Sequence, residues 1–491
     1  MSQELNKKSG RAVAWSSVTE IMAKLITPIV NIFLARLLAP EAFGAVATIT
    51  MVITFAEIFT DAGFQKYIVQ HEFEDEDELN KSTNVAFWTN FVFSCLITAL
   101  IVIFRNPIAK LVGSPDLGNA IAIASLSIVM VAFSSIQMAR FKRDLDFKSL
   151  FFVRIGSSLI PLVVTIPLAF ILRNFWALVI GTLSKNLFNA IALSIRSRWK
   201  PKFFYRFSLF KEMFSFSAWT LLESIVIWLT VNIDIFILGT TLDDYHLGIY
   251  KTSMTTVNSY MSLITATIMP VLFSTLSRCQ NDDEGFKNVF WRFFKFTALL
   301  TIPMSVGIFL YSDLVTLLLL GSQWKQASFF MGLWGLMSGF SIIFCNFASE
   351  VYRSKGNPKI STVSQIIQIV CLVPTVLLAS SLDFNLLCLI RGLARGYGII
   401  INLIIMWTMY NLKITKMMCQ IFPAIVSTLI MAVFATVFLH INQSVWWQIL
   451  SIAICVVIYF SSLFLIFPKV RKEILSLTPV HRVINRLKIK K

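Results

Sequence analysis

Two long apolar stretches near the N-terminus decide the fold. They read AVAWSSVTEIMAKLITPIVNIFLARLL at residues 12–38 and AFGAVATITMVITFAEIFTDAGFQKYI at residues 42–68, with Ala39-Pro40-Glu41 between them. An α-helix rises about 1.5 Å per residue, so about 20 apolar residues cross the hydrocarbon core of a bilayer. Each stretch is long enough, and the sequence therefore predicts a hairpin of two membrane-spanning helices.

Both arms of this hairpin carry charges at positions where charges are costly. Glu20 and Lys24 are four residues apart on the first arm, and Glu57 and Asp61 are four apart on the second. Residues four apart share one face of a helix. An ionisable side chain near the centre of the bilayer costs about 2.5–3.5 kcal/mol on insertion scales, so it normally faces protein or a water-filled cavity. The hairpin is therefore predicted to line an internal polar cavity.

Each of these pairs also has a structural interpretation. Glu20 and Lys24 can neutralise each other along one helix instead of contacting a ligand. Of Glu57 and Asp61, one can be protonated, or both can face water. Asp61 lies near the inner end of its arm and can simply reach the interface.

The composition identifies the class of protein. Of the 491 residues, 56% are hydrophobic and only 14% are charged, and the mean hydropathy is +0.74. Such values indicate an all-α, polytopic membrane protein. The apolar runs are continuous, which excludes a β-barrel with its short alternating segments. The seven cysteines and four histidines show no ligand spacing, so we expect no metal site and no cofactor.

Hydropathy predicts fourteen spans. They cover residues 12–38, 42–68, 82–104, 118–138, 149–172, 175–196, 213–240, 246–277, 292–320, 326–352, 359–381, 385–410, 419–441 and 445–467. No connection is long enough for a soluble domain. The acidic run from Glu72 to Glu78 is expected to open the third helix, because acids favour a helix N-terminus.

The positive residues alternate between the two sides. With a cytoplasmic N-terminus, the outside connections hold only Arg36, Arg105, Lys110, Arg173 and Lys325, and the inside connections hold many more, among them Arg140, Arg154, Arg196, Arg198, Lys200 and Lys202. The positive-inside rule then places both termini in the cytoplasm. The net charge of +17 is thus explained by topology, without a nucleic-acid partner.

An internal repeat joins the two halves of the chain. Ala14-Trp15 recurs as Ala218-Trp219 and Phe43-Gly44 as Leu247-Gly248, both 204 residues later, and the Phe87-Trp88 pair recurs as Phe290-Trp291. The repeat unit holds six spans, an even number, so two parallel six-helix repeats are predicted, related by an axis along the membrane normal. The expected domains are an N-lobe (1–211), a C-lobe (212–416), two extra C-terminal helices (417–468) and a basic cytoplasmic tail (469–491).

Further charges lie inside the later spans: Lys185, Glu223, Asp234, Lys251, Arg391 and Arg395. The intramembrane cations Lys24, Lys185, Lys251, Arg391 and Arg395 suit an anionic ligand, and the guanidinium fork of arginine suits phosphate oxygens. Lys251 lies within two turns of the outer surface and can alternatively extend its ammonium group to the interface. No motif for ATP hydrolysis or covalent catalysis is present, so we do not expect an enzyme.

At several segments the chain resembles a known family. Phe33 to Ala47, Asp61 to Phe64, Leu79 to Trp88, Gln137 to Lys148, and Asp234 to Tyr250 are similar to the Wzx/WzxC-type flippases of the multidrug/oligosaccharidyl-lipid/polysaccharide exporter superfamily. The resemblance covers most of the first eight predicted spans. It implies a two-lobed, V-shaped cavity in the bacterial inner membrane, through which undecaprenyl-diphosphate-linked oligosaccharide crosses to the outer leaflet. Related flippases place cations in that cavity, which the resemblance carries to Lys24, Lys251, Arg391 and Arg395.

The corresponding hypothesis is alternating access, with the diphosphate held by the deep cations and the lipid tail left in the bilayer. The acids Glu20, Glu57, Asp61, Glu223 and Asp234 then either neutralise those cations in the empty state or bind a coupling ion, H⁺ or Na⁺. Expected partners are membrane lipid, a polysaccharide polymerase and chain-length machinery. A multidrug/cation antiporter of the same superfamily would need a mainly acidic cavity. A glycosyl polymerase would need a large outside loop, and a scaffold would leave the buried charges without a purpose.

Overall fold

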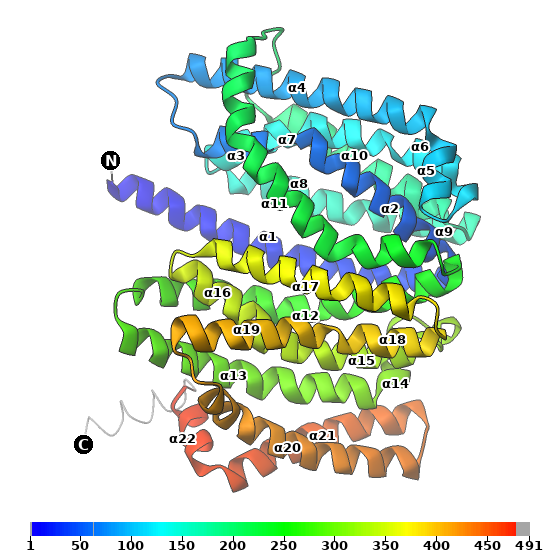
Figure 1. Cartoon of the computed structure of the whole chain (residues 1–491), viewed down its shortest axis with the longest axis vertical. Helices are drawn as coiled ribbons and strands as arrows, with labels where there is room; N and C mark the ends of the chain where they lie inside the picture. The colour runs from blue at the N-terminus through cyan, green and yellow to red at the C-terminus, as the bar shows by residue number, and fades with distance from the viewer. Residues whose placement is uncertain (1, 62, 478–491) are drawn as a thin grey trace. The chain divides into compact units, whose positions relative to one another are not determined.

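The computed structural model describes residues 2–61 and 63–477, and it describes their side chains except at 2–14, 17, 21, 61, 215–220, 223 and 475–477. Within these residues every regular element is a helix, as Figure 1 shows. Asp61 and Glu223, two of the predicted acids, therefore lie outside the described side chains, and most of the basic tail lies outside the described residues.

The first part of the chain forms α1 (Ser2–Leu37), α2 (Pro40–Asp61), α3 (Phe64–Gln70), α4 (Glu76–Ile103), α5 (Arg105–Leu111), α6 (Gly118–Ala124), α7 (Leu126–Arg143), α8 (Phe147–Ile160), α9 (Ile166–Leu172), α10 (Trp176–Arg196) and α11 (Phe207–Gly239). The second part forms α12 (Asp244–Arg278), α13 (Asp283–Leu310), α14 (Ser312–Leu319), α15 (Ala327–Ser341), α16 (Phe347–Ser354), α17 (Pro358–Ala379), α18 (Phe384–Leu393), α19 (Arg395–Tyr410), α20 (Ile414–Ile441), α21 (Val445–Ile466) and α22 (Pro468–Leu477). Single π-helical turns continue α8 into α9 and α15 into α16.

Thirteen stretches of the described helices are long and apolar enough to cross a membrane. They correspond to thirteen of the fourteen predicted spans. The remaining one, predicted at 213–240, falls on α11, of which Ser224–Gly239 is a shorter apolar helix among the described residues. The chain is thus a multi-pass membrane protein, and the count of fourteen stays a prediction.

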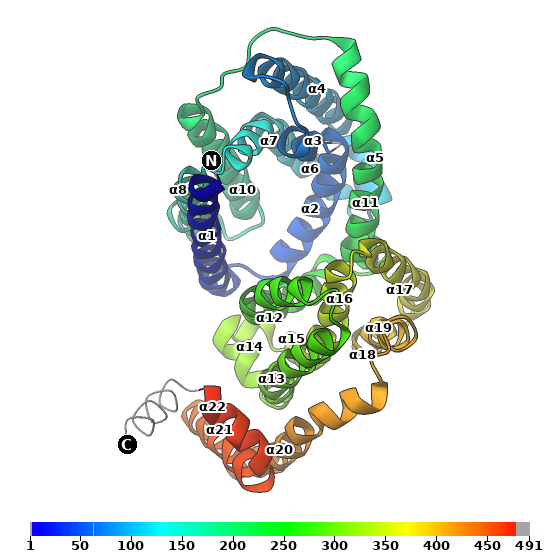
Figure 2. The same cartoon turned by 90° about the vertical axis from the view of Figure 1, so that its left-hand side faces the viewer.

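Packing divides the chain into two units. The first comprises residues 1–266, 319–324 and 365–391, and the second 267–318, 325–364 and 392–491. The two lobes were predicted from the sequence repeat, and their boundaries differ from those of the packing units. The lobes therefore stay a prediction. In the first unit, α8 packs against α1 and α10, α10 against α7, and α7 against α3 and α4, an order that Figure 2 shows nearly end-on. Also in this unit, α2 packs against α4, α7 and α11.

In the second unit, α13 packs against α15 and α20, and α20 against α21. Two tyrosines fasten α21 to the segment around α13. Tyr459 donates to the carbonyl of Leu299 at 2.8 Å, and the hydroxyl of Tyr311 bonds that of Ser451 at 2.9 Å. In Figure 1, α20 and α21 run side by side. By their residue ranges, the predicted helices at 419–441 and 445–467 correspond to α20 and α21.

Several helices begin earlier than hydropathy predicts, and two of them show the reason. The third span was expected from residue 82 and the ninth from 292, but α4 begins at Glu76 and α13 at Asp283. In both cases an aspartate caps the start: Asp75 accepts from the backbone N–H of Glu78, and Asp282 accepts from that of Gly285. The first turn of each helix is acidic, so hydropathy places the start of the span too late. The expectation that the acidic run opens the third helix is confirmed.

The aromatic motif of the repeat has the same internal geometry in each unit. Phe87 stacks on Phe91 with ring centroids 6.1 Å apart and meets Trp88 edge-on at 5.4 Å. In the other unit, Phe290 stacks on Phe294 at 5.4 Å and meets Trp291 edge-on at 5.0 Å. The repeated residues therefore form repeated contacts, while the symmetry relating the halves stays a prediction.

Two glycines bring the starts of α2 and α12 into direct contact. A Cβ placed on Gly44 would lie 1.9 Å from the carbonyl oxygen of Asp244, and one on Gly248 would lie 1.9 Å from that of Pro40. Gly248 and Asp244 follow Gly44 and Pro40 by the same 204 residues, so the contact is reciprocal. Such an exchange of equivalent contacts is typical of a two-fold interface.

The ends of α1 and α11 are also repeat partners, and each is contacted by a connecting segment from elsewhere in the first unit. Gln323 Nε2 donates to the carbonyls of Ala35 and Leu38, at 2.6 and 2.9 Å, and Trp324 Nε1 donates to that of Ala35 at 2.7 Å. These bonds satisfy carbonyls at the end of α1 that lack partners within the helix. At the end of α11, a Cβ on Gly113 would lie 2.0 Å from the carbonyl oxygen of Gly239, the residue 204 positions after Ala35.

We predict that Gly44→Ala and Gly248→Ala each destabilise the protein by about 1–3 kcal/mol, because the added methyl group overlaps backbone that cannot rotate away. The double variant should cost less than the sum, since the first methyl already separates the two helices. Thermal unfolding of the purified protein in detergent measures both effects. Gly307→Ala is the control, because nothing lies within 4 Å of a Cβ there. Melting of Gly44→Ala at the temperature of this control would contradict the prediction.

Candidate functional site

A buried ion pair joins α18 to α11 within the first unit. Arg391 donates to Asp234 Oδ2 through Nη2 at 2.8 Å and Nε at 3.1 Å, and the hydroxyl of Tyr250 donates to the same oxygen at 2.7 Å. Arg391 is 7% exposed, Asp234 1% and Tyr250 0%. A buried ion pair is stable only when its polar atoms are well bonded, and here one carboxylate oxygen receives three donors.

This cluster brings together two residues with predicted roles. Arg391 was predicted as a substrate-binding cation and Asp234 as a counter-charge, and they neutralise each other here. Lys251 follows Tyr250 in sequence, is half-buried, and lies close enough to Asp234 to be attracted by it. Contact with substrate stays a prediction for Arg391 and Lys251.

A second cluster lies on α1, α8 and α10. Glu20 Oε1 pairs with Arg154 Nη1 at 2.6 Å, with 41% and 53% of the two side chains exposed. The alternative of a Glu20–Lys24 pair along α1 is therefore wrong. Lys185 on α10 is exposed and close enough to Arg154 for the two charges to repel. Two predicted residues, Glu20 and Lys185, thus lie beside a common arginine.

Arg154 corrects the sequence analysis in a further way. It was counted among the cations of an inside connection, but it lies on the second turn of α8. Asp146 accepts from the N–H of Ser149 and caps the helix, which therefore begins at Phe147. Arg154 is thus a charge within a candidate span, although sequence analysis did not list it as one.

Arg395 lies in the second unit against α15. Its guanidinium carbon is 4.0 Å from the ring centroid of Trp334, and Nη1 bonds the hydroxyl of Ser338. Arg391 and Arg395 are four residues apart, a spacing that favours one helix face, and α18 ends at Leu393 while α19 begins at Arg395. The two arginines have different partners.

The remaining predicted residues have no ion pair within the described part of the chain. Lys24, Lys185 and Lys251 form none with any described side chain, and neither does the half-buried Glu57 on α2. The side chains of Asp61 and Glu223 are not described, so their surroundings are not assigned. Among the predicted site cations, these three lysines have no carboxylate partner in the described part of the chain, which suits an anionic ligand.

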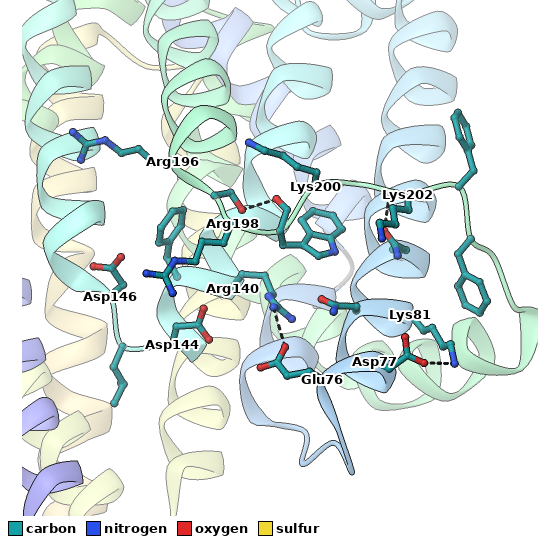
Figure 3. Close-up of a pocket in the computed structure, with 18 residues that line it drawn as sticks. Glu76, Asp77, Lys81, Arg140, Asp144, Asp146, Arg196, Arg198, Lys200 and Lys202 are labelled. Atoms are coloured by element: carbon teal, nitrogen blue, oxygen red, sulfur yellow. Dashed lines mark hydrogen bonds and ion pairs between the residues drawn. The ribbon is translucent and has the colours of Figure 1, made fainter.

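Sequence analysis missed a charged pocket in the first unit. A cavity of about 1060 Å³ lies where α4 begins, where α7 and α10 end, and along the segment that follows α10. Figure 3 shows basic side chains around it: Lys81, Arg140, Arg196, Arg198, Lys200 and Lys202. Four acids also line it: Glu76, Asp77, Asp144 and Asp146. Most of these cations were explained by topology alone. Aromatic residues alternate with these cations at 199–204, and this pattern could have indicated a binding site in the sequence.

Comparison with known proteins identifies the family. Residues 33–329, more than half of the chain, match the family described as "Polysaccharide biosynthesis protein". The chain belongs to this family.

Two curated relatives and one solved structure illustrate the similarity. The succinoglycan biosynthesis transport protein ExoT of Rhizobium meliloti (strain 1021) is 24% identical over 340 residues, covering 69% of this chain and 68% of ExoT. The lipopolysaccharide biosynthesis protein WzxC of Escherichia coli (strain K12) is 20% identical over 328 residues, covering 66% of this chain and 65% of WzxC. The chain thus matches about two thirds of the length of these relatives. The structure of the lipid II flippase MurJ, in an inward closed conformation, aligns with a TM-score of 0.76 at 14% identity, covering 93% of this chain and 99% of MurJ. This likeness establishes a shared fold.

We predict that Asp234→Asn and Arg391→Gln each destabilise the protein by about 3–5 kcal/mol, because each leaves a buried charge without its partner. Replacing both, as Asp234→Leu with Arg391→Met, should recover much of the loss, since no buried charge remains. Thermal unfolding in detergent and the yield of monodisperse protein measure the effect. Equal melting of wild type and Arg391→Gln would show that the pair is not structural.

Glu20→Gln should behave differently. Its ion pair with Arg154 is half-exposed, so its loss should change stability by less than about 1 kcal/mol. A variant that melts like wild type but transports slowly would assign the carboxylate to transport. A large loss of stability would contradict the prediction.

Proposed function

We propose that this chain is a flippase that moves undecaprenyl-diphosphate-linked oligosaccharide from the cytoplasmic to the outer leaflet of the bacterial inner membrane. The product would serve the synthesis of capsule, exopolysaccharide or O-antigen. The observation that carries the proposal is the family match over residues 33–329 in a chain with thirteen candidate spans. The names of ExoT and WzxC, a succinoglycan biosynthesis transport protein and a lipopolysaccharide biosynthesis protein, support the same substrate class.

The physical need for such a protein is clear. A diphosphate with a sugar chain cannot cross hydrocarbon, because its polar groups would lose hydration worth many kcal/mol. A path that opens to one side at a time would remove this barrier while the lipid tail stays in the bilayer. Moving about two negative charges outward across an inside-negative potential of about 100 mV also releases roughly 4–5 kcal/mol. An anionic head is therefore drawn outward by the potential.

The described charges support an anionic head more than a cationic drug. Glu20 and Asp234 are already engaged by Arg154 and Arg391, whereas Lys24, Lys185 and Lys251 have no ion pair among the described side chains. A cation antiporter would need the reverse balance. In the proposed cycle, Glu57, Asp61 and Glu223 are the acids left to bind H⁺ or Na⁺.

Several finer features belong to the same proposal. The termini are cytoplasmic, following the positive-inside rule. The chain moves its substrate without chemical change and uses no cofactor, so it is not an enzyme. Its partners are the lipid-linked oligosaccharide, membrane lipid, and the polymerase and chain-length machinery that use the product outside.

The test is translocation in reconstituted vesicles that contain an undecaprenyl-diphosphate-linked sugar. The protein bearing Lys185→Gln and Arg395→Gln together should flip the lipid at least tenfold more slowly than wild type, at unchanged folded yield, because two cations that would hold the phosphates are lost. Lys110→Gln with Lys325→Gln is the matched control, since both of these lysines are exposed and lie in predicted outside connections. A wild-type rate in the first variant would refute the role of these cations, and a wild type without flipping would refute the function.

A further inference from the structure

The pocket at the start of α4 and the ends of α7 and α10 is unusual in its mixture of side chains. A cavity of about 1060 Å³ is large for a site that holds only a phosphate group, since drug-sized ligands occupy about 300–1,000 Å³. Its wall includes six cations, four carboxylates, the amides of Asn80 and Asn84, and the rings of Trp199 and Phe141. This combination offers charge, hydrogen bonding and aromatic surface in one place.

Arg140 is a mostly buried cation of this pocket whose hydrogen bonding is incomplete. Only 11% of its side chain is exposed, and its ion pair is a 3.5 Å contact from Nη2 to the exposed Glu76. Its Nε and Nη1 atoms are buried without a hydrogen-bond partner. Burying guanidinium nitrogens without partners is costly, so the incomplete bonding of Arg140 at the wall of this cavity indicates a place for an anion.

The segment after α10 that forms one wall is held in place. The N–H of Lys202 donates to Asn84 Oδ1 at 2.9 Å, and Trp88 Nε1 donates to the carbonyl of Lys202 at 2.9 Å. Ser197 Oγ donates to the carbonyl of Trp199 at 2.8 Å, and the Trp199 ring meets Phe87 edge-on. These contacts hold the backbone of Lys202 and the ring of Trp199 against α4. Figure 3 shows Lys202 among the side chains that line the pocket.

The acids in the wall decide between possible anions. The headgroup of a simple acidic phospholipid uses the cations but offers few or no hydroxyls to Asp144 and Asp146. A sugar joined to diphosphate uses both kinds of residue, because carboxylates and amides accept hydrogen bonds from sugar hydroxyls and arginines donate to phosphate oxygens. The aromatic rings provide an apolar surface for a sugar face.

We propose that this pocket binds a sugar joined to a diphosphate, with Arg140 and Arg198 on the phosphates and the carboxylates and amides on the sugar. This proposal rests on the proposed function, because the pocket lies on the predicted cytoplasmic side, where the flippase would bind the lipid-linked oligosaccharide. Two sources share this chemistry, the head of the polyprenyl-linked substrate and a water-soluble nucleotide sugar.

The experiment measures equilibrium binding to the full-length chain in lipid nanodiscs. The probes are undecaprenyl-diphosphate-linked glucose, UDP-glucose and phosphatidylglycerol. Binding is measured in the Lys185→Gln/Arg395→Gln background, so that two of the proposed transport cations do not contribute. Adding Arg140→Gln with Arg198→Gln should weaken binding of the sugar diphosphates at least tenfold, and Arg140→Lys with Arg198→Lys should recover part of it. The control, Lys148→Gln with Lys359→Gln, removes two exposed charges outside the pocket and should leave affinity unchanged.

The ligand is located by amine labelling and mass spectrometry. Bound sugar diphosphate should protect Lys81 and Lys202, relative to Lys359, in the background but not in the pocket variant. Binding of the undecaprenyl compound alone assigns the pocket to the membrane substrate, and binding of UDP-glucose as well assigns recognition to the sugar diphosphate itself.

Three results would overturn the proposal: equal affinity in the pocket variant and its control, binding without protection, or phosphatidylglycerol as the tighter ligand. If the wild-type protein does not flip the lipid, the proposed function is refuted. The binding results would still show separately whether the pocket holds a sugar diphosphate.

Discussion

The cost of placing a charge in hydrocarbon constrains this structure more than any other interaction. It determines why α11, α12 and α18, from distant parts of the sequence, meet at one carboxylate oxygen of Asp234. Arg391 could not remain within a span without an acid, and Asp234 could not remain there without donors. Tyr250 completes the bonding without adding charge. The cluster thus works as a polar junction, and its three helices must keep their register for all three donors to reach one atom.

Where no charge is involved, close approach of the backbones holds the helices together. Lipid chains are as apolar as leucine, so helices in a membrane gain little from hiding apolar side chains and associate through tight packing of small residues. Gly44 and Gly248 provide that packing at the starts of α2 and α12. Gly44 accommodates the carbonyl of Asp244, and Gly248 accommodates that of Pro40, the repeat partner of Asp244. The polar junction and the glycine contact both involve α12, which therefore links the two ways in which this unit is held together.

Hydropathy predicted thirteen spans that the described helices contain, because length and apolarity are local properties. It could not predict where α4 and α13 begin, since Asp75 and Asp282 cap turns that are polar. Partners were harder still. Helical spacing suggested Lys24 for Glu20, but the carboxylate bonds Arg154, which is distant in sequence and becomes a neighbour only when α8 packs on α1. The pocket was missed for a related reason: Arg140, Arg198 and Lys202 satisfied the positive-inside rule, and a residue that already explains topology shows no further role until its neighbours are known.

The partners found in the structure change how the predicted charges are weighed. From sequence, the five predicted cations and five predicted acids of the spans cancel, and the sign of a transport path is undecided. Packing pairs Asp234 with Arg391, and it pairs Glu20 with Arg154, an arginine that was counted among the cations of an inside connection. Among the described side chains this leaves Lys24, Lys185 and Lys251 against Glu57, and Arg395 keeps its charge beside the neutral side chains of Trp334 and Ser338. The Asp234–Arg391 pair removes one charge of each sign, so only the pairing of Glu20 with Arg154, which was not among the five cations, makes the balance of the predicted charges more positive. The preference for an anion thus depends on Arg154, which holds an acid, as well as on the lysines that would hold the phosphates.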